Sequence, residues 1–252
     1  MTFDLADFQI RQAAAVTATL DGLETLGAVT AKDAKAARAA IARADHAQAL
    51  SRTYETHVAA AVAAAGDQLT HTDDLTLGAV LDAVQAPSAE TVDGALYVVW
   101  AANVKAARNL AFANKAKVPG LLNEQFDAIA TRTAEVLSKL GPNTTAVQAI
   151  DRGLTVEFRE VDTLRAAYEG ACELRSTLRS YGIIPGGDGY SSGWSWNFRK
   201  EFTAGAFKRA GEQPDPARAR FLVAIAHEPY CAASEAEARA VLEAAQREQV
   251  TA

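Results

Sequence analysis

Alanine restricts the fold of this chain more than any other feature, because it makes up 57 of the 252 residues. Alanine has the highest intrinsic helix propensity of the amino acids. A chain of this length also buries enough surface to fold without disulfide or metal cross-links. We therefore expect an all-α protein, with a multi-helix, bundle-like body and a smaller helical unit at its C-terminal end.

Charge and hydropathy exclude several classes of protein. No apolar run approaches the roughly 18 residues that a transmembrane helix needs, and the start MTFDLADFQI lacks the basic residues of a signal peptide. The net charge of -6 argues against broad binding to nucleic acid or to anionic membranes. Cys172 and Cys231 are isolated, which is typical of a reducing compartment. We expect a protein of the cytoplasm, or of an assembled particle, with no membrane partner.

Caps and breakers divide the first half of the chain into helices. We expect helices over about 4–26, from Thr30 to about Gly66, from Thr72 or Asp73 to Pro87, and from Ser88 to about Lys117.

Two later helices carry narrow apolar stripes with spacings of three and four. The first stripe consists of Leu122, Phe126, Ile129, Thr133, Val136 and Leu140, and the second consists of Val161, Leu164, Tyr168, Ala171, Leu174, Leu178 and Tyr181. Stripes of this width are typical of contacts between helices in a bundle.

A glycine-rich segment divides the chain near residue 182. The sequence GIIPGGDGYSSG from 182 to 193 cannot continue a helix. We expect a helical body over 1–182, a loop over 183–193 and a helical unit over 194–252. That unit should hold three helices near 195–210, 216–228 and 234–249, with Asp215 and Ser234 as N-caps.

Charges occur in blocks along the sequence. No lysine or arginine lies between Thr53 and Val104, whereas Lys105, Arg108, Lys115 and Lys117 follow with no acid among them. Complementarity with the helix dipole explains this arrangement locally. The alternative is that acidic and basic blocks meet across a subunit interface.

Catalytic motifs are weak. Residues 189–193 match G-x-S-x-G, and Asp215 and His227 follow in the order of a hydrolase triad, but the expected strand before the serine is missing. His46 and His57 are about 16 Å apart on one helix, too far to share an ion. His227 and Cys231 have the spacing of a ligand pair on one helix, but Pro229 lies between them and breaks the helical geometry. We therefore predict no catalytic residue, metal or cofactor.

The best candidate for function is a cluster of aromatic and basic residues over 190–209, which begins in the stretch between Ala171 and Ala204 where alanine is absent. The cluster consists of Tyr190, Trp194, Trp196, Phe198, Arg199, Lys200, Phe202, Phe207, Lys208 and Arg209. Three interpretations stay open: a second small core, a protein interface rich in aromatic residues and arginine, and a surface that stacks on single-stranded bases.

The hypothesis that fits these patterns best is a non-enzymatic structural or assembly subunit. It would act through helix packing and the aromatic-basic cluster in a larger oligomer, such as a virion or a similar multi-subunit particle, with protein partners or other copies of itself. The alternatives are a helical enzyme or ligand-binding protein with its site at the glycine-rich loop, and a nucleic-acid-binding protein.

Overall fold

The protein is all-α, as predicted. The computed structural model describes residues 3–70, 89–141, 144–186, 193–201 and 204–251, and every regular element in these ranges is a helix. The chain forms two compact units. Unit 1 consists of Met1–Thr17 and Lys32–Ala111, and unit 2 consists of Ala18–Ala31 and Phe112–Ala252. No helix in the described ranges has both the length and the apolar character needed to span a bilayer.

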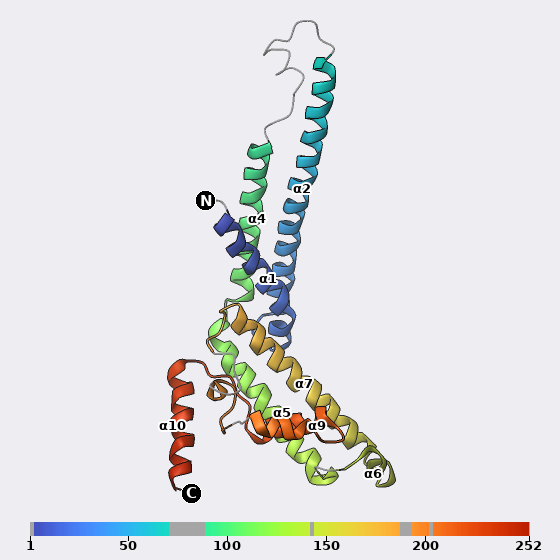
Figure 1. Cartoon of the computed structure of the whole chain (residues 1–252), viewed down its shortest axis with the longest axis vertical. Coiled ribbons are helices and arrows are strands. Elements are labelled where there is room, and N and C mark those ends of the chain that lie inside the picture. The colour runs from blue at the N-terminus through green and yellow to red at the C-terminus, as the bar shows by residue number, and fades with distance from the viewer. Residues whose placement is uncertain (1–2, 71–88, 142–143, 187–192, 202–203, 252) are drawn as a thin grey trace. The chain divides into compact units, whose positions relative to one another are not determined.

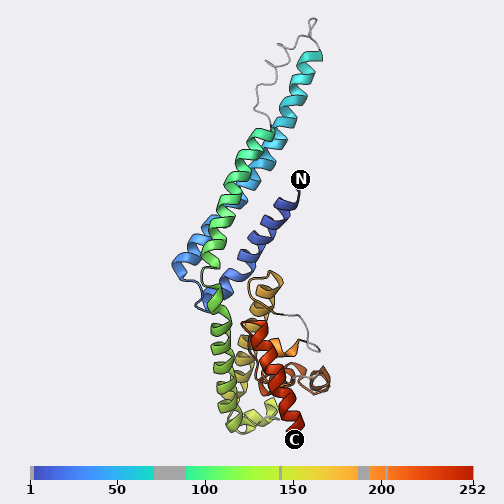
Figure 2. The same ribbon diagram turned by 90° about the vertical axis from the view of Figure 1, so that its left-hand side faces the viewer.

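Unit 1 is built around an antiparallel pair of helices. It contains the first part of α1 (Phe3–Thr25), most of α2 (Ala31–Thr70) and α4 (Ala89–Ala111), and α2 and α4 run side by side (Figures 1 and 2). Arg43 Nε donates to Asn103 Oδ1 at 2.9 Å, and Ser51 Oγ donates to Asp93 Oδ1 at 2.5 Å. The residue numbers rise on one helix as they fall on the other, so the two helices are antiparallel.

The core of unit 1 joins small residues to one large ring. Ala44 and Ala47 of α2 pack against Trp100 and Val104 of α4. Because alanine fills little space, the indole of Trp100 fits against the backbone side of α2. This contact lies in the first half of α2.

The helix predicted to end near Gly66 continues to Thr70. A glycine inside a helix costs only about 1 kcal/mol relative to alanine, and the alanine-rich residues before it favour helix strongly. The predicted end was therefore wrong. The helix predicted between Thr72 and Pro87 lies outside the described residues.

The C-terminal end of the helix predicted from Ser88 to about Lys117 also differs in the structure. α4 ends at Ala111, and a short 3-10 helix, η1 (Lys115–Lys117), connects it to α5 (Val118–Leu140). Pro119 lies in the first turn of α5, where a missing backbone N–H costs nothing. The helix predicted to run from Ser88 to about Lys117 therefore ends earlier, and Pro119 belongs to the start of the next helix.

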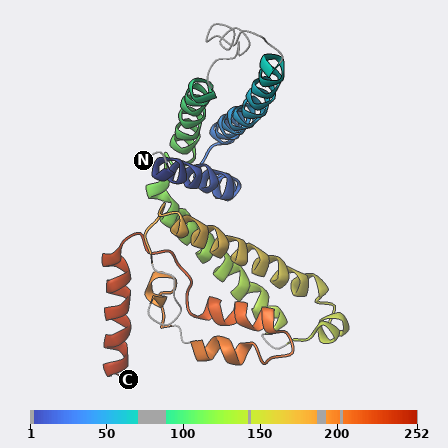
Figure 3. The same cartoon turned by 45° about the horizontal axis from the view of Figure 1, so that its top comes forward.

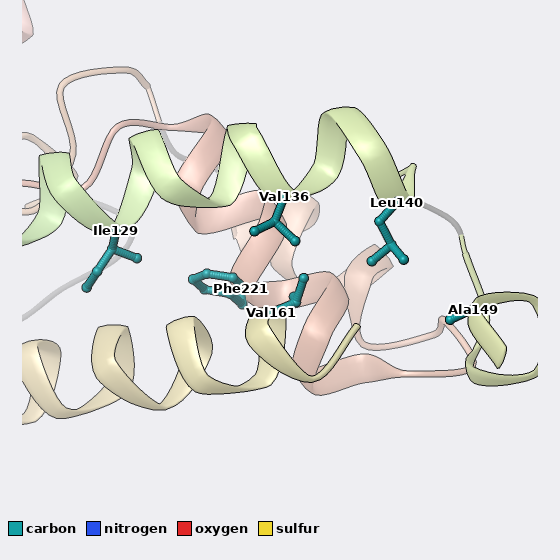
Figure 4. Close-up of a cluster of buried hydrophobic side chains, with 6 residues drawn as sticks. All are labelled: Ile129, Val136, Leu140, Ala149, Val161 and Phe221. Carbon is teal, nitrogen blue, oxygen red and sulfur yellow. The ribbon is translucent and has the colours of Figure 1, made fainter. Parts of the chain in front are cut away.

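Unit 2 is centred on the pair formed by α5 and α7 (Thr155–Ser180), which lie along each other (Figure 3). All six residues of the first predicted stripe are buried. Ile129, Val136 and Leu140 pack with Val161 of α7 and Phe221 (Figure 4). The periodicity thus predicted the buried face of α5 correctly.

The ends of these helices follow their sequence signals. Gly141 closes α5 and Gly182 follows α7, both with positive φ, at 86° and 66°. Thr145 begins α6 (Ala146–Asp151) with a capping box that includes Gln148.

Gly22 of α1 lies so close to α7 that a Cβ there would approach Leu174 Cδ1 to 2.8 Å.

The described C-terminal part of unit 2 contains one short 3-10 helix and three α-helices. These are η2 (Trp194–Trp196), α8 (Ala204–Ala210), α9 (Pro216–Ala226) and α10 (Glu235–Thr251). The helix predicted over 195–210 is wrong in its first half. There Phe198 forms an antiparallel bridge with Pro229, and Tyr230 N donates to Asn197 O at 2.8 Å.

Candidate functional site

The aromatic residues of the predicted cluster that the structure describes point into unit 2. Trp194 and Phe198 are buried together with Ala224, and Phe207 of α8 is partly buried against them. Trp196 packs against a neighbouring cluster around Tyr230. These rings hold the C-terminal segment together, which matches the interpretation of the cluster as a small core.

Basic residues of the cluster lie at the surface. Arg199 Nη1 is 2.9 Å from Asp127 Oδ1, and its guanidinium lies 5.5 Å from the centroid of the Tyr230 ring. Lys200 Nζ is 2.7 Å from Glu228 Oε1. Each of these two cations already has an acidic partner within its own unit.

The other four residues of the cluster are two exposed basic residues and two aromatic residues outside the described ranges. Lys208 and Arg209 are exposed in the last turn of α8. Tyr190 and Phe202 lie outside the described residues. The role of this cluster as an interface stays a prediction. Its described rings are turned inward and its basic side chains outward.

Two arginines of α7 attach the C-terminal segment, and the sequence analysis missed them. Arg175 is only 7% exposed, and its Nη1 donates to Tyr230 O at 2.6 Å. Its guanidinium lies 5.1 Å from the centroid of the Phe126 ring. Arg175 is four residues after Ala171 and three before Leu178, so its place within an apolar stripe was the signal for a buried arginine.

Arg179, one turn later in α7, also binds the C-terminal segment through hydrogen bonds. Its Nη2 donates to Trp196 O at 2.9 Å and its Nε to Pro185 O at 3.2 Å, and Nη1 donates to the Asn197 side chain. A Cβ on Gly186 would lie 2.2 Å from Arg179 Nε, and Gly186 has a φ of 146°, so any other residue there would displace the arginine and strain the backbone. The start of the glycine-rich loop is thereby held against α7.

These contacts explain why the compact units differ from the predicted division at 183–193. Arg175 and Arg179 bind backbone carbonyls on both sides of the bridge between Phe198 and Pro229. Residues 194–252 therefore belong to the same compact unit as α5 and α7.

Both cysteines lie beside this network. Asn123 of α5 makes two hydrogen bonds with the backbone of Cys231: its Oδ1 accepts from Cys231 N at 2.6 Å and its Nδ2 donates to Cys231 O at 3.2 Å. Burial raises the pKa of the Cys172 and Cys231 thiols, while the neighbouring arginines act in the opposite direction. The thiols are therefore poor nucleophiles at neutral pH.

The remaining catalytic candidates have structural roles where the structure describes them. Asp215 caps α9 by accepting from Arg218 N at 3.1 Å. His227 Nδ1 is 2.6 Å from Val223 O at the end of the same helix. The serines of the G-x-S-x-G match lie outside the described residues. Within the described ranges, no three His, Cys, Asp or Glu residues come together as a metal site.

Arg218 is the most unusual buried charge of unit 2. It is 5% exposed, and none of its three side-chain nitrogens has a hydrogen-bond partner within the described chain. Its guanidinium lies 4.4 Å from the centroid of the Phe158 ring. Burial lowers the pKa of Arg218, whereas Asp162 and Asp215 raise it. Attraction to the ring and to these acids replaces direct hydrogen bonds.

Unit 1 presents a different kind of surface, which is apolar and uncharged. Residues 58–65 of α2 read VAAAVAAA, and five of them are exposed, including Val62 at 50%. Ser51 lies opposite Asp93, so this stretch extends past the described start of α4 at Ala89. A helix that is apolar on every side is ordinarily covered by other protein.

α4 carries a second apolar surface, on the side opposite Trp100. Gly94, Ala95, Val98 and Ala102 lie on this side at helical spacing, and all four are exposed, with Val98 at 65%. We call residues 58–65 of α2 and these four residues of α4 the apolar faces of unit 1.

Comparison of the chain with protein-family models, with curated proteins and with solved structures found no match in any of the three.

Proposed function

We propose that the protein is a non-enzymatic assembly subunit that associates with further helices through the apolar faces of unit 1. This keeps the role expected from the sequence and moves its main contact from the aromatic-basic cluster to α2 and α4. The observation that carries the proposal is the uncharged stretch 58–65 of α2, in which five of the eight residues are exposed.

The size of the hydrophobic effect supports this proposal. Each methylene-sized group that leaves water contributes about 0.8 kcal/mol. Five exposed side chains in one stretch of α2, together with those on α4, therefore give several kcal/mol for each copy that covers them. Small side chains also let helix backbones approach closely, which favours a helix as the partner over a loop.

A second copy of the chain is the partner that this surface suits best. The two faces are alike in being small, apolar and helical, so either can pack against its counterpart in a symmetric oligomer. A larger particle, such as a virion or a similar multi-subunit shell, is a setting in which such contacts repeat. Nucleic-acid binding is the weaker candidate, because the buried rings of Trp194 and Phe198 are not free to stack on bases.

The test is the mass of the intact chain in solution. Light scattering at micromolar concentration should give a multiple of the 26.6 kDa chain mass. The double variant Ala60→Glu with Ala63→Glu places two charges on the exposed stretch, and because glutamate is a good helix former the helix should persist. The oligomer formed by this variant should have a lower mass in solution than the oligomer formed by the unmodified chain.

A matched control comes from the same helix. Ala42 is exposed in a part of α2 that already carries charges, so Ala42→Glu should leave the mass unchanged. Strictly monomeric behaviour of the unmodified chain, with no partner recovered from the native source, would contradict the proposal. An unchanged mass in the Ala60 and Ala63 variant would contradict the assigned surface.

A further inference from the structure

Unit 1 contains a cavity between α1, α2 and α4 that the proposed assembly does not use. Its volume is about 270 Å³. Trp100 and Leu96 form part of its wall, and Ile10 and Tyr97 lie at its more exposed edge. The Tyr97 and Trp100 rings are stacked, with centroids 6.1 Å apart and an interplanar angle of 28°. The wall is thus mainly apolar and aromatic, as in most small-molecule sites.

One carboxylate lies in this apolar wall. Ser51 Oγ donates to Asp93 Oδ1 at 2.5 Å, which fixes the orientation of the carboxylate. The second oxygen, Oδ2, has no hydrogen-bond partner in the described part of the chain. One oxygen of Asp93 is therefore held in place while the other is available.

No cation of the described chain neutralises Asp93. Thr53–Val104 contains no lysine or arginine. Arg11 and Arg52 adjoin the lining residues Ile10 and Ser51 in sequence, but neither forms an ion pair with Asp93 in the described chain. Because the walls exclude water from one side, an ion pair formed here is stronger than the same pair in bulk water. Aromatic rings add to this, since cations are attracted to their faces.

We propose that this cavity binds a small organic cation, in which an ammonium or guanidinium group is carried on an apolar or aromatic body. The charged group would pair with Asp93, and the body would fill the space beside Leu96 and Trp100. An apolar molecule without the charge would leave the carboxylate unpaired, and an inorganic cation would leave the apolar wall uncovered. The site therefore discriminates by requiring both features.

The experiment compares two probes of the same shape on the unmodified chain. Calorimetric titration with 2-phenylethylamine, which is cationic at neutral pH, should show binding at least about tenfold tighter than titration with neutral 2-phenylethanol. Asp93→Asn keeps the size of the side chain and removes its charge, so the amine should then bind only as well as the alcohol. Asp45→Asn, at an exposed position of α2, should leave the preference unchanged.

Three results would overturn the assignment. Equal affinities of the unmodified chain for the two probes would show that the cavity responds to apolar shape alone. Absence of binding by either probe at millimolar concentration would show that the cavity is not a ligand site. A preference that survives Asp93→Asn in a variant with unchanged helix content by circular dichroism would place the cation elsewhere. The comparison of the two probes needs no variant, so it stands even where Asp93→Asn unfolds.

Discussion

Arg175→Met should destabilise unit 2 far more than loss of a surface arginine. Methionine fills much of the space of the arginine stem but donates no hydrogen bond. The substitution leaves the carbonyl of buried Tyr230, now 2.6 Å from Arg175 Nη1, without its donor. It also removes the cation next to the Phe126 ring.

The expected cost follows from these contacts. A hydrogen bond from a charged donor contributes about 1.5–3 kcal/mol, and an unpaired buried carbonyl adds to the loss. The contact with the aromatic ring contributes about 1 kcal/mol. Arg175→Met should therefore lower the free energy of unfolding by about 3 kcal/mol, which corresponds to a decrease in Tm of about 6–12 °C for a unit of this size.

Tryptophan emission during urea unfolding can measure this effect within unit 2. Trp194 and Trp196 lie in unit 2 and Trp100 lies in unit 1, so a Trp100→Phe background restricts the signal to the unit of interest. The control is Arg165→Met on the same helix. Arg165 is partly exposed and pairs with Glu169 at 2.9 Å, and such a surface pair contributes about 1 kcal/mol or less.

The comparison between the two variants decides the question. An Arg175→Met midpoint that falls no further than that of Arg165→Met would refute the claim that α7 holds the C-terminal segment through this side chain. A large loss for both variants would point to the helix itself rather than to the contact with Tyr230.

Three further predictions concern the described residues of unit 2. Thr145→Ala removes the capping box at α6 and should cost about 1 kcal/mol in thermal unfolding, and a shift below the error of that measurement would contradict it. Burial raises the pKa of Tyr230 to about 12, so as the pH rises the hydroxyl loses its proton in the unfolded chain before it does so in the folded chain. The contribution of Tyr230 to the free energy of unfolding should therefore be full below pH 10, where a free tyrosine titrates, and should decrease between pH 10 and about 12. Tyr230→Phe should remove that part of the decline in unfolding experiments against pH. Cys172 and Cys231 should react slowly with iodoacetamide at pH 8 and rapidly once the chain is unfolded. Equal rates in the two states would contradict the partial burial of Cys172 and the burial of Cys231.

Local sequence signals predicted the long helices of unit 2, whereas α6 was not predicted and the helix expected over 195–210 was wrong in its first half. The 3-and-4 spacing from Leu122 to Leu140 predicted the buried face of α5, because one helix packed along another buries one stripe. Gly141 and Gly182 end their helices with positive φ, which glycine adopts without strain.

Contacts between distant segments could not be predicted from local signals. The extended chain at Phe198 exists because Pro229 and its neighbours pair with it, about thirty residues later in the sequence. The aromatic-basic cluster showed the same limit: its composition fits a core and an interface equally well, and only the packing of Trp194 against Ala224 distinguishes the fate of its rings.

The apolar faces of unit 1 were missed for a different reason. The alanines of α2 were interpreted as a sign of helix propensity, which they are, but propensity does not show which of them a neighbouring helix covers. Ala44 is buried and Ala60 is exposed although both lie in the same helix. Ala44 and its neighbour in the next turn, Ala47, are covered by Trp100 and Val104 of α4.

The two arginines of α7 recognise mainly backbone carbonyls, and this affects how the sequence can vary. A carbonyl is present whatever side chain its residue carries, so the acceptors at positions 185, 196 and 230 would survive many substitutions. The donors have no such freedom, because lysine cannot reach several carbonyls with one planar group. In related chains we expect Arg175, Arg179 and Gly186 to be kept while much of the segment they hold diverges.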